Sequence, residues 1–405
     1  MVSKLPTERQ LKFLDWEFGV FFHFGIRTFY EGHKDWDNKP MPLEGFMPSE
    51  LNCESWIKTI KAAGAKYAIL VCKHHDGFAN WPSRYTDYAV QNTPWKGGKG
   101  DVVREFTDAC RKYGVGVGLY YSPAQWGNKK ALTSREYNDY FINQLSELLQ
   151  NYGKIDSLWL DGCGSEDFTF DTGRIVAAIR RLQPDVCLFH MFDPDTRWVG
   201  NEAGYAYVDN SDVAAGTFSP DLDFHGEKFL PAECPCMMRE HNWFYSEYDV
   251  HTVKSVEELT GMYYHSVGNG ANLLLNIGPD RRGLLPEVDS ERLLEFGDEI
   301  RRRFNSPIPS EYEPAADGGV LKLPGMRLVN QLVLRESLTC GEKIKSFDVY
   351  IKGGHIYNKA MIYSGKYIGH KRIVTFPSVN TSEVIISVEA EEGFQLLKPE
   401  VYHLE

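Results

Sequence analysis

Three carboxylates of this chain directly follow short apolar runs, where a buried strand would deliver them to one site. Asp161 follows SLWL, Glu202 ends RWVGNE and Glu233 ends KFLPAE. A carboxylate at the end of a buried strand costs free energy unless it has a partner or a role. Hydrolysis of a glycosidic bond needs two such groups, one ionised as the nucleophile and one protonated as the acid. The three residues are therefore candidates for that chemistry.

Each carboxylate also has an ordinary structural interpretation. Asp161 precedes a glycine and is compatible with a turn or a helix N-cap. Arg197 is a candidate ion-pair partner of Glu202, although it could instead hold a glycan or orient that carboxylate. Glu233 could pair with Arg239 in the same way.

Three histidines and two tyrosines also lie at the ends of apolar runs. His23 lies in GVFFHFG, and His74 and His75 end KYAILVCKHH. A neutral imidazole can donate a hydrogen bond to a sugar hydroxyl. Tyr120 and Tyr121 end VGVGLYY, and only one of them can face the site because successive strand residues point to opposite faces. The sequence does not decide which one it is.

Tryptophans are candidates for the walls of a sugar pocket. Trp159 lies two residues before Asp161 and should share its face of the strand. Trp36, in KDWDNKPM, and Trp243 could stack on sugar rings or serve as loop anchors. Aromatic residues make up 13% of the chain, and this excess weakly favours a carbohydrate ligand.

A metal site is the competing chemistry for the histidines. His23, His74, His75 and Asp161 on one rim would resemble the metal site of an amidohydrolase. That chemistry uses an H-x-H pair, however, and the chain has a single histidine at 23. Adjacent histidines on a continuing strand would also point to opposite faces. We therefore expect no metal and no cofactor. The G-x-S-x-G motif of a serine nucleophile is absent as well.

The elements that must position these residues alternate between apolar runs and amphipathic helical stretches. The runs span residues 19–25, 66–75, 115–122, 157–162, 186–191, 197–202, 228–234 and 271–278. Eight strands with intervening helices over roughly 300 residues predict an α/β fold, the (β/α)8 or TIM barrel. The active site of such a barrel lies at the C-terminal ends of its strands, where the polar residues named above are found.

A change in composition divides the chain. Residues 1–305 form the predicted (β/α)8-like catalytic barrel, and the Pro- and Gly-rich segment 306–319 is typical of a linker. Residues 320–405 contain short alternating runs separated by turn residues, which predict a small antiparallel β-sandwich.

Charge and hydropathy exclude several functions. The chain carries 44 Lys and Arg against 56 Asp and Glu, a net charge of −12, without a basic block that would bind nucleic acid or an anionic membrane. No apolar stretch is long enough to span a bilayer. The N-terminus lacks a signal-peptide pattern, so we expect a cytoplasmic protein, or a secreted or periplasmic one if a leader was trimmed. The sequence does not reveal the oligomeric state.

Several segments resemble the α-L-fucosidases of glycoside hydrolase family 29. The string AKYAILVCKHHDGFANWPSRYTDYAV carries the strongest resemblance, supported by FGVFFHFGIRTFYEG, KGGKGDVVREFTDACRKYG, LWLDG and NLLLNIGPDRRG. They cover most of residues 10–305 in the order of the family. The resemblance implies a (β/α)8-like barrel with a C-terminal β-sandwich, and metal-free exo-hydrolysis of α-L-fucosides with retention.

The resemblance also implies roles for individual residues. Asp161 matches the nucleophile of the W-x-D-G motif, and His23, His74 and His75 match pocket histidines. The segment PDTRWVGNEAG resembles the branch of the family that is specific for α-1,3/1,4-linked fucose, which implies Glu202 as the acid/base. Glu233 is the second candidate for the acid.

The chain departs from that branch on the aglycone side. In its G-W-F-Y-H motif the glycine is replaced by Asn242 and the histidine by Ser246. The expected substrate is a fucosylated oligosaccharide or glycan. A broad-specificity fucosidase that hydrolyses aryl fucosides and a catalytically weak fucose-binding relative are the alternatives.

Overall fold

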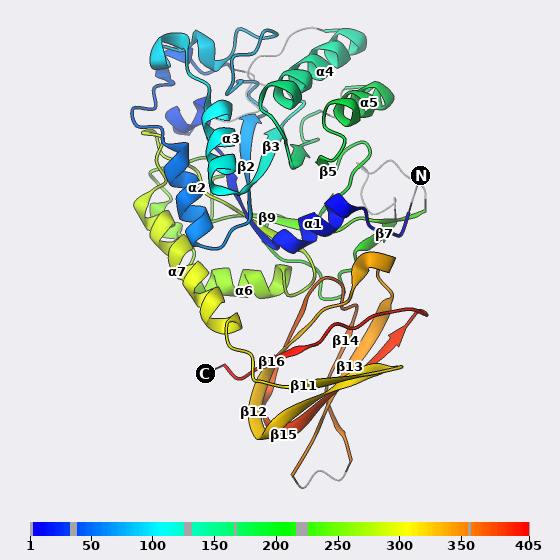
Figure 1. The fold of residues 1–405 in the computed structure, drawn as a ribbon. Helices are drawn as coiled ribbons and strands as arrows, with labels where there is room; N and C mark the ends of the chain where they lie inside the picture. Colours follow the sequence, from blue (N-terminus) through cyan, green and yellow to red (C-terminus); the bar gives the residue numbers. More distant parts are fainter. Residues whose placement is uncertain are drawn as a thin grey trace.

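The computed structural model describes residues 3–32, 39–124, 132–165, 168–215, 226–354 and 358–404. A parallel eight-stranded barrel surrounded by helices is followed by an antiparallel β domain (Figure 1). The predicted fold class is confirmed.

The barrel strands run parallel to one another in the order β5-β4-β3-β2-β1-β10-β9-β6. They are β1 (Phe18–Phe22), β2 (Tyr67–Lys73), β3 (Gly116–Tyr121), β4 (Ser157–Leu160), β5 (Cys187–Phe189), β6 (Arg197–Trp198), β9 (Ala232–Met237) and β10 (Asn272–Asn276). A parallel bridge between Phe189 and Thr196 connects the two ends of this order. Each of the eight predicted runs overlaps one of these strands.

The helices are α1 (Glu8–Trp16), α2 (Cys53–Ala62), α3 (Val102–Tyr113), α4 (Ser134–Asn151), α5 (Thr172–Leu182), α6 (Val256–Ser266) and α7 (Glu287–Phe304). The side chain of Asp101 caps α3 by accepting from the N–H of Arg104. The side chain of Asn52 caps α2 in the same way by accepting from the N–H of Ser55. None of the helices in the described ranges is long and apolar enough to cross a membrane.

The middle of the barrel is irregular. No helix is present in the described segment between β5 and β6, and β6 has only two residues. The short antiparallel pair β7 (Val213–Ala215) and β8 (Glu227–Phe229) precedes β9. This irregularity leaves the loop after β6, which carries Glu202, outside the regular strand-to-helix pattern.

Aromatic side chains fill the inside of the barrel. Phe21, Tyr67, Tyr120, Trp159 and Phe189 belong to one buried cluster contributed by five strands. A Cβ atom at Gly19 would lie 2.4 Å from the ring of Tyr67, so glycine makes room there for a large ring. The interior is thus a packed core, and a ligand can bind only above it.

The C-terminal domain has its own hydrophobic core and one six-stranded antiparallel sheet. Its strands are β11 (Glu311–Ala315), β12 (Gly318–Leu334), β13 (Ile344–Lys352), β14 (Ala360–Lys366), β15 (Arg372–Ala390) and β16 (Glu400–Tyr402). The linker predicted over 306–319 is shorter than expected, because β11 lies inside it and pairs with β12. The Pro and Gly residues of this segment indicated a linker, but an edge strand such as β11 tolerates proline.

Candidate active site

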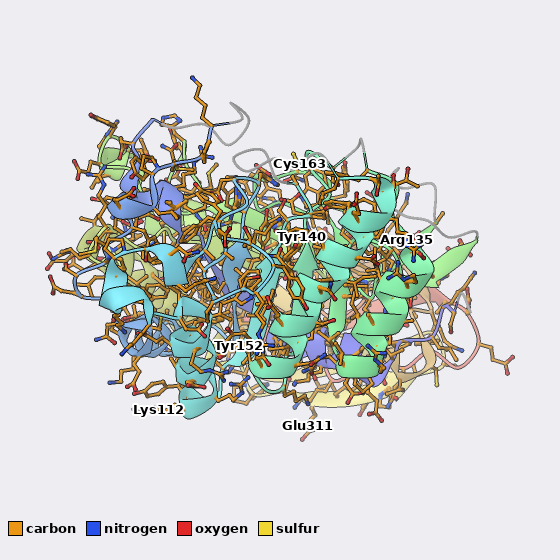
Figure 2. All side chains as sticks on the ribbon, turned by 90° about the horizontal axis from the view of Figure 1, so that it is seen from above. Lys112, Arg135, Tyr140, Tyr152, Cys163 and Glu311 are labelled. Atoms are coloured by element: carbon orange, nitrogen blue, oxygen red, sulfur yellow. The ribbon has the colours of Figure 1, made fainter. Side chains whose placement is uncertain are left out.

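A cavity of about 780 Å³ opens at the C-terminal ends of the barrel strands, a size suited to a small ligand. Eight of the predicted site residues line it: His23, His74, His75, Tyr120, Trp159, Asp161, Glu202 and Trp243. Cys163, which follows β4, also lines the cavity and is exposed rather than packed. Figure 2 shows Cys163 at the opposite end of the barrel from Lys112 at the C-terminal end of α3.

The carboxylate of Asp161 accepts two hydrogen bonds and lies close to a histidine. Its Oδ2 accepts a hydrogen bond from the hydroxyl of Tyr120 at 2.8 Å, and Nε2 of His75 lies 3.6 Å from the same oxygen. Its Oδ1 accepts from the backbone N–H of Cys163 at 3.0 Å. Nδ1 of His75 lies 2.6 Å from Oγ of Ser122, which orients the imidazole. The carboxylate is fixed in place and still faces the cavity.

Both histidines at 74 and 75 line the cavity, which corrects the expectation that they point to opposite faces. That expectation assumed a continuing strand, but β2 ends at Lys73. The pairing between β2 and β3 also shifts register between Val71 and Lys73. The His74 ring stacks on Tyr120 with ring centroids 5.6 Å apart.

His23 is fixed by residues from two other elements. Its Nδ1 lies 2.7 Å from Oδ1 of Asn276, and the amide of Asn276 donates to the carbonyl of Trp243 at 2.7 Å. The rings of His23 and Trp243 have centroids 5.0 Å apart. The loop that carries Trp243 is thereby joined to the ends of β1 and β10.

Aromatic rings close the bottom of the cavity. Trp159 stacks between Tyr120, with centroids 5.4 Å apart, and Phe189, with centroids 4.0 Å apart. Phe21 packs against both Tyr120 and Trp159. We call Phe21, Tyr120, Trp159 and Phe189 the aromatic floor. Stacking covers both faces of the Trp159 ring, so the floor offers apolar ring edges against which the C–H groups of a sugar can pack.

Glu202 lies at the exposed rim of the cavity, on the loop after β6. Desolvation by the surrounding protein raises its pKa, and repulsion from the charge of Asp161 raises it further. The side chain of Trp243, as a hydrogen-bond donor, opposes this rise. The loop itself is fixed because the indole N–H of Trp198 donates to the carbonyl of Asn201 at 3.0 Å. A carboxyl whose pKa is raised therefore shares the cavity with a carboxylate that is fixed in place.

Two predicted substrate contacts lie outside the cavity. Tyr121 points away from the barrel axis and donates to Oε1 of Gln144 on α4 at 2.6 Å, so Tyr120 is the tyrosine that faces the site. Arg197 is buried and donates to Oδ1 of Asn210 at 2.7 Å and to the carbonyl of Ser211. The prediction that Arg197 contacts a glycan is therefore wrong. Its side chain instead holds the segment that follows the Glu202 loop.

Glu233 is the third predicted site residue that lies outside the cavity. It lies below the aromatic floor with 1% of its surface exposed, and it does not line the cavity. Tyr67 donates to its Oε1 at 2.5 Å and Trp159 donates to its Oε2 at 2.8 Å. Burial raises its pKa to about 7.

Sequence reasoning missed several residues of the cavity, and Trp36 lies outside the described residues. The missed residues include Phe21, Arg27, Glu31, Phe189, His190 and Trp198. Phe21, Phe189 and His190 follow the same strand-end pattern that identified the others. Arg27 lies in the short 3-10 helix Ile26–Phe29 and Glu31 follows it, in a connection whose course the sequence does not specify. Within the described residues, no group of three or more His, Cys, Asp and Glu side chains is arranged to hold a metal ion.

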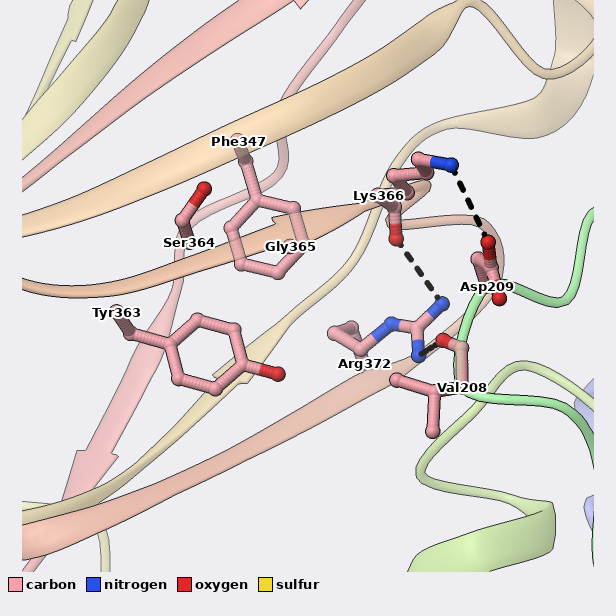
Figure 3. Close-up of a pocket in the computed structure, with 8 residues that line it drawn as sticks. All are labelled: Val208, Asp209, Phe347, Tyr363, Ser364, Gly365, Lys366 and Arg372. Atoms are coloured by element: carbon pink, nitrogen blue, oxygen red, sulfur yellow. Dashed lines mark hydrogen bonds and ion pairs between the residues drawn. The ribbon is translucent and has the colours of Figure 1, made fainter.

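A second cavity, of about 260 Å³, lies where the barrel meets the C-terminal sheet (Figure 3). Lys366 pairs with Asp209 at 3.3 Å, and Arg372 donates to the carbonyl of Val208 at 2.6 Å. Arg372 also donates to the carbonyl of Lys366 at 3.3 Å. These polar groups tie β14 and β15 to the barrel, so this cavity belongs to the joint between the two domains.

An aromatic pocket with two carboxylates at the C-terminal mouth of a (β/α)8 barrel has the fold and the site of a glycoside hydrolase. The family model for α-L-fucosidases matches residues 3–303. The chain therefore belongs to the α-L-fucosidase family, glycoside hydrolase family 29.

Named relatives agree with this assignment. The chain is 31% identical to "Alpha-L-fucosidase 1" of Arabidopsis thaliana over 93% of this chain and 83% of the relative. It is 27% identical to "Plasma alpha-L-fucosidase" of Homo sapiens over 69% of this chain and 65% of the relative. The crystal structure of a putative α-L-fucosidase from Bacteroides thetaiotaomicron superimposes with a TM-score of 0.90 at 32% identity, covering 98% of this chain and 97% of that one.

The two adjacent tyrosines offer a matched pair of variants. Tyr120→Phe should lower kcat/KM for an aryl α-L-fucoside about 10- to 100-fold, because a hydrogen bond to a charged group contributes about 1.5–3 kcal/mol. Tyr121→Phe removes a buried hydroxyl on the other face, so it should lower thermal stability and leave kcat/KM within about twofold. Equal losses of kcat/KM in the two variants would contradict the assignment of Tyr120 to the site.

Proposed function

We propose that this chain is a retaining exo-α-L-fucosidase in which Asp161 is the nucleophile and Glu202 is the acid/base. The observation that carries the proposal is the contrast between two carboxyl groups in one cavity. Asp161 accepts hydrogen bonds on both oxygens, which fix the carboxylate in the cavity. Desolvation and the neighbouring charge of Asp161 raise the pKa of Glu202. The fixed group suits the nucleophile of the first step, and the group with the raised pKa suits the acid.

In the first step, a carboxylate oxygen of Asp161 attacks the anomeric carbon of a terminal α-L-fucosyl group. The bond from that carbon to the glycosidic oxygen breaks, and Glu202 transfers its proton to the departing oxygen. The product is a β-fucosyl ester on Asp161 and a free aglycone. The hydrogen bond from Tyr120 weakens the nucleophile slightly but aligns the oxygen that attacks.

In the second step, Glu202 is ionised and accepts a proton from a water molecule. The oxygen of that water attacks the anomeric carbon, and the bond to Asp161 breaks. Fucose leaves with the α configuration of the substrate, and both carboxyl groups return to their starting protonation states. Two inversions at one carbon give net retention.

The closed aromatic floor supports cleavage at chain ends. The floor closes the cavity from below, so a glycan would enter it by its end and the fucose should be terminal. The methyl group of fucose should contact aromatic side chains, and its hydroxyls should bind His23, His74 and His75, which line the cavity.

Removal of the nucleophile gives the first test. Asp161→Gly should lower kcat at least about 10³-fold, as expected when a covalent-catalysis residue is removed. Azide should then restore turnover by entering the vacated space, and the product should be β-L-fucosyl azide. In the matched variant Glu202→Ala, Asp161 still forms the intermediate, so azide should give the α anomer. The α-azide from Asp161→Gly and the β-azide from Glu202→Ala would instead make Glu202 the nucleophile and Asp161 the acid/base.

The pH dependence gives the second test. Because Glu202 must be protonated to act as the acid, kcat/KM should fall as pH rises through its raised pKa. In Glu202→Gln, an aryl fucoside whose phenolate leaves without protonation should show no such alkaline fall. Persistence of the fall in the variant would assign it to another group.

We further propose a preference for α-1,3/1,4-linked fucose on branched glycans. The segment RWVGNE, with Glu202, supports this through its resemblance to the linkage-specific branch. The rim supports it through a polar wall: Ser246 donates to Glu31, and Arg281 pairs with Glu31 at 2.8 Å. Such a wall can form hydrogen bonds with the hydroxyls of a second sugar. An aryl group lacks these hydroxyls and cannot form the same hydrogen bonds.

A comparison of two substrates tests this preference. Free fucose should appear faster from a Lewis-type trisaccharide than from an aryl α-L-fucoside. Glu31→Ala should slow release from the trisaccharide about 10-fold and leave the aryl substrate unchanged, because it removes a charged hydrogen-bond partner only on the aglycone side. Equal turnover of both substrates by the unaltered enzyme would indicate the broad-specificity activity, and no turnover of either would indicate a fucose-binding relative.

A further inference from the structure

The buried carboxylate of Glu233 joins three strands beneath the site. Glu233 lies on β9, and its two oxygens accept from Tyr67 on β2 and Trp159 on β4. With 1% of its surface exposed, it has no open path to a ligand in the cavity. Both donors are neutral, so the carboxylate gains no ion pair from them. Burying a carboxylate with only neutral partners costs folding free energy. We therefore expect Glu233 to have a function that offsets this cost.

The barrel interior is shaped to allow this contact. Tyr67 occupies the space where a side chain at position 19 would lie, since a Cβ at Gly19 would be 2.4 Å from its ring. Glu233 is in register with Asn272 on β10, whose amide donates to the carbonyl of Phe13 on α1 at 2.6 Å. The strand that carries Glu233 is thus paired with β10, which does not line the cavity and is joined to α1 through Asn272.

We propose that Glu233 is a positioning residue that sets the orientation of Trp159 and, through the stack on Tyr120, the position of the nucleophile. The bond to the indole N–H fixes the rotation of the Trp159 ring, which lies between Tyr120 and Phe189. The Tyr120 hydroxyl in turn donates to Asp161. One buried hydrogen bond therefore determines both the floor under the sugar and the alignment of Asp161. The second part rests on the proposed nucleophile.

Two substitutions separate this role from that of an acid/base. In Glu233→Gln, the amide oxygen can still accept from Trp159 and the NH2 group can donate to the oxygen of Tyr67. Positioning therefore predicts a loss of kcat/KM of less than about 10-fold for Glu233→Gln and about 100-fold for Glu233→Ala, which leaves two buried donors without an acceptor. An acid/base role predicts that both variants lose activity equally and that azide restores it. That result would overturn the proposal.

Glu336 provides the matched control. It is also buried, with 3% of its surface exposed, and burial raises the pKa of both carboxyls to about 7. It accepts from the backbone N–H groups of Lys343 and Ile344 in the C-terminal domain, remote from the cavity. Glu336→Ala should lower thermal stability but leave kcat and KM within about twofold, because it loses a buried acceptor far from the floor.

Calorimetric titration with L-fucose tests the floor separately from catalysis. Glu233→Ala should bind L-fucose about 10-fold more weakly, because the displaced Trp159 ring loses its contact with the sugar. The affinity of Glu233→Gln should stay within about threefold of that of the unaltered enzyme. Trp159→Phe keeps a ring but lacks the N–H, so its effect and that of Glu233→Ala should not add. Unchanged fucose affinity in Glu233→Ala, or additive effects, would overturn the proposal. Failure of the Asp161 assignment alone would leave this binding result intact.

Discussion

Closure of eight parallel strands into a ring is the constraint on which the site depends. Because all barrel strands run in one direction, their C-terminal ends meet at one rim. Side chains separated by 41 residues along the chain, Asp161 and Glu202, thereby enter one cavity. The weak point of the ring is β6, two residues long, which is joined to β5 through a single bridge between Phe189 and Thr196. The loop that carries Glu202 follows this weak point.

Environment divides the carboxyl groups among different tasks. Asp161 accepts hydrogen bonds on both oxygens, whereas desolvation and the charge of Asp161 raise the pKa of Glu202 at the rim. The surroundings of Glu233 differ from both, because it is buried below the aromatic floor and accepts from two neutral donors. Identical chemistry in the side chain thus gives three outcomes, set by burial and by the donors within reach.

Much of this arrangement could be predicted from the sequence, because strand periodicity and strand-end polarity are local properties. The eight apolar runs predicted the barrel, and the residues at their ends predicted Asp161, Glu202 and the three histidines as neighbours. The choice between Tyr120 and Tyr121 required the register of β3, which depends on strands that are distant in sequence. Both His74 and His75 face the cavity because β2 ends at Lys73, two residues before the end of the run predicted over 66–75. Arg197 and Glu233 were misplaced because their partners come from other strands and loops.

Identification of the residue that carries the sugar would test the account most directly. A 2-deoxy-2-fluoro-α-L-fucoside with an activated leaving group should react once and accumulate as an ester, because fluorine slows the release step. Mass spectrometry of the digested enzyme should find the added sugar on the peptide that contains Asp161. A label on Glu202 or Glu233, or hydrolysis with inversion and no label on any residue, would contradict the mechanism.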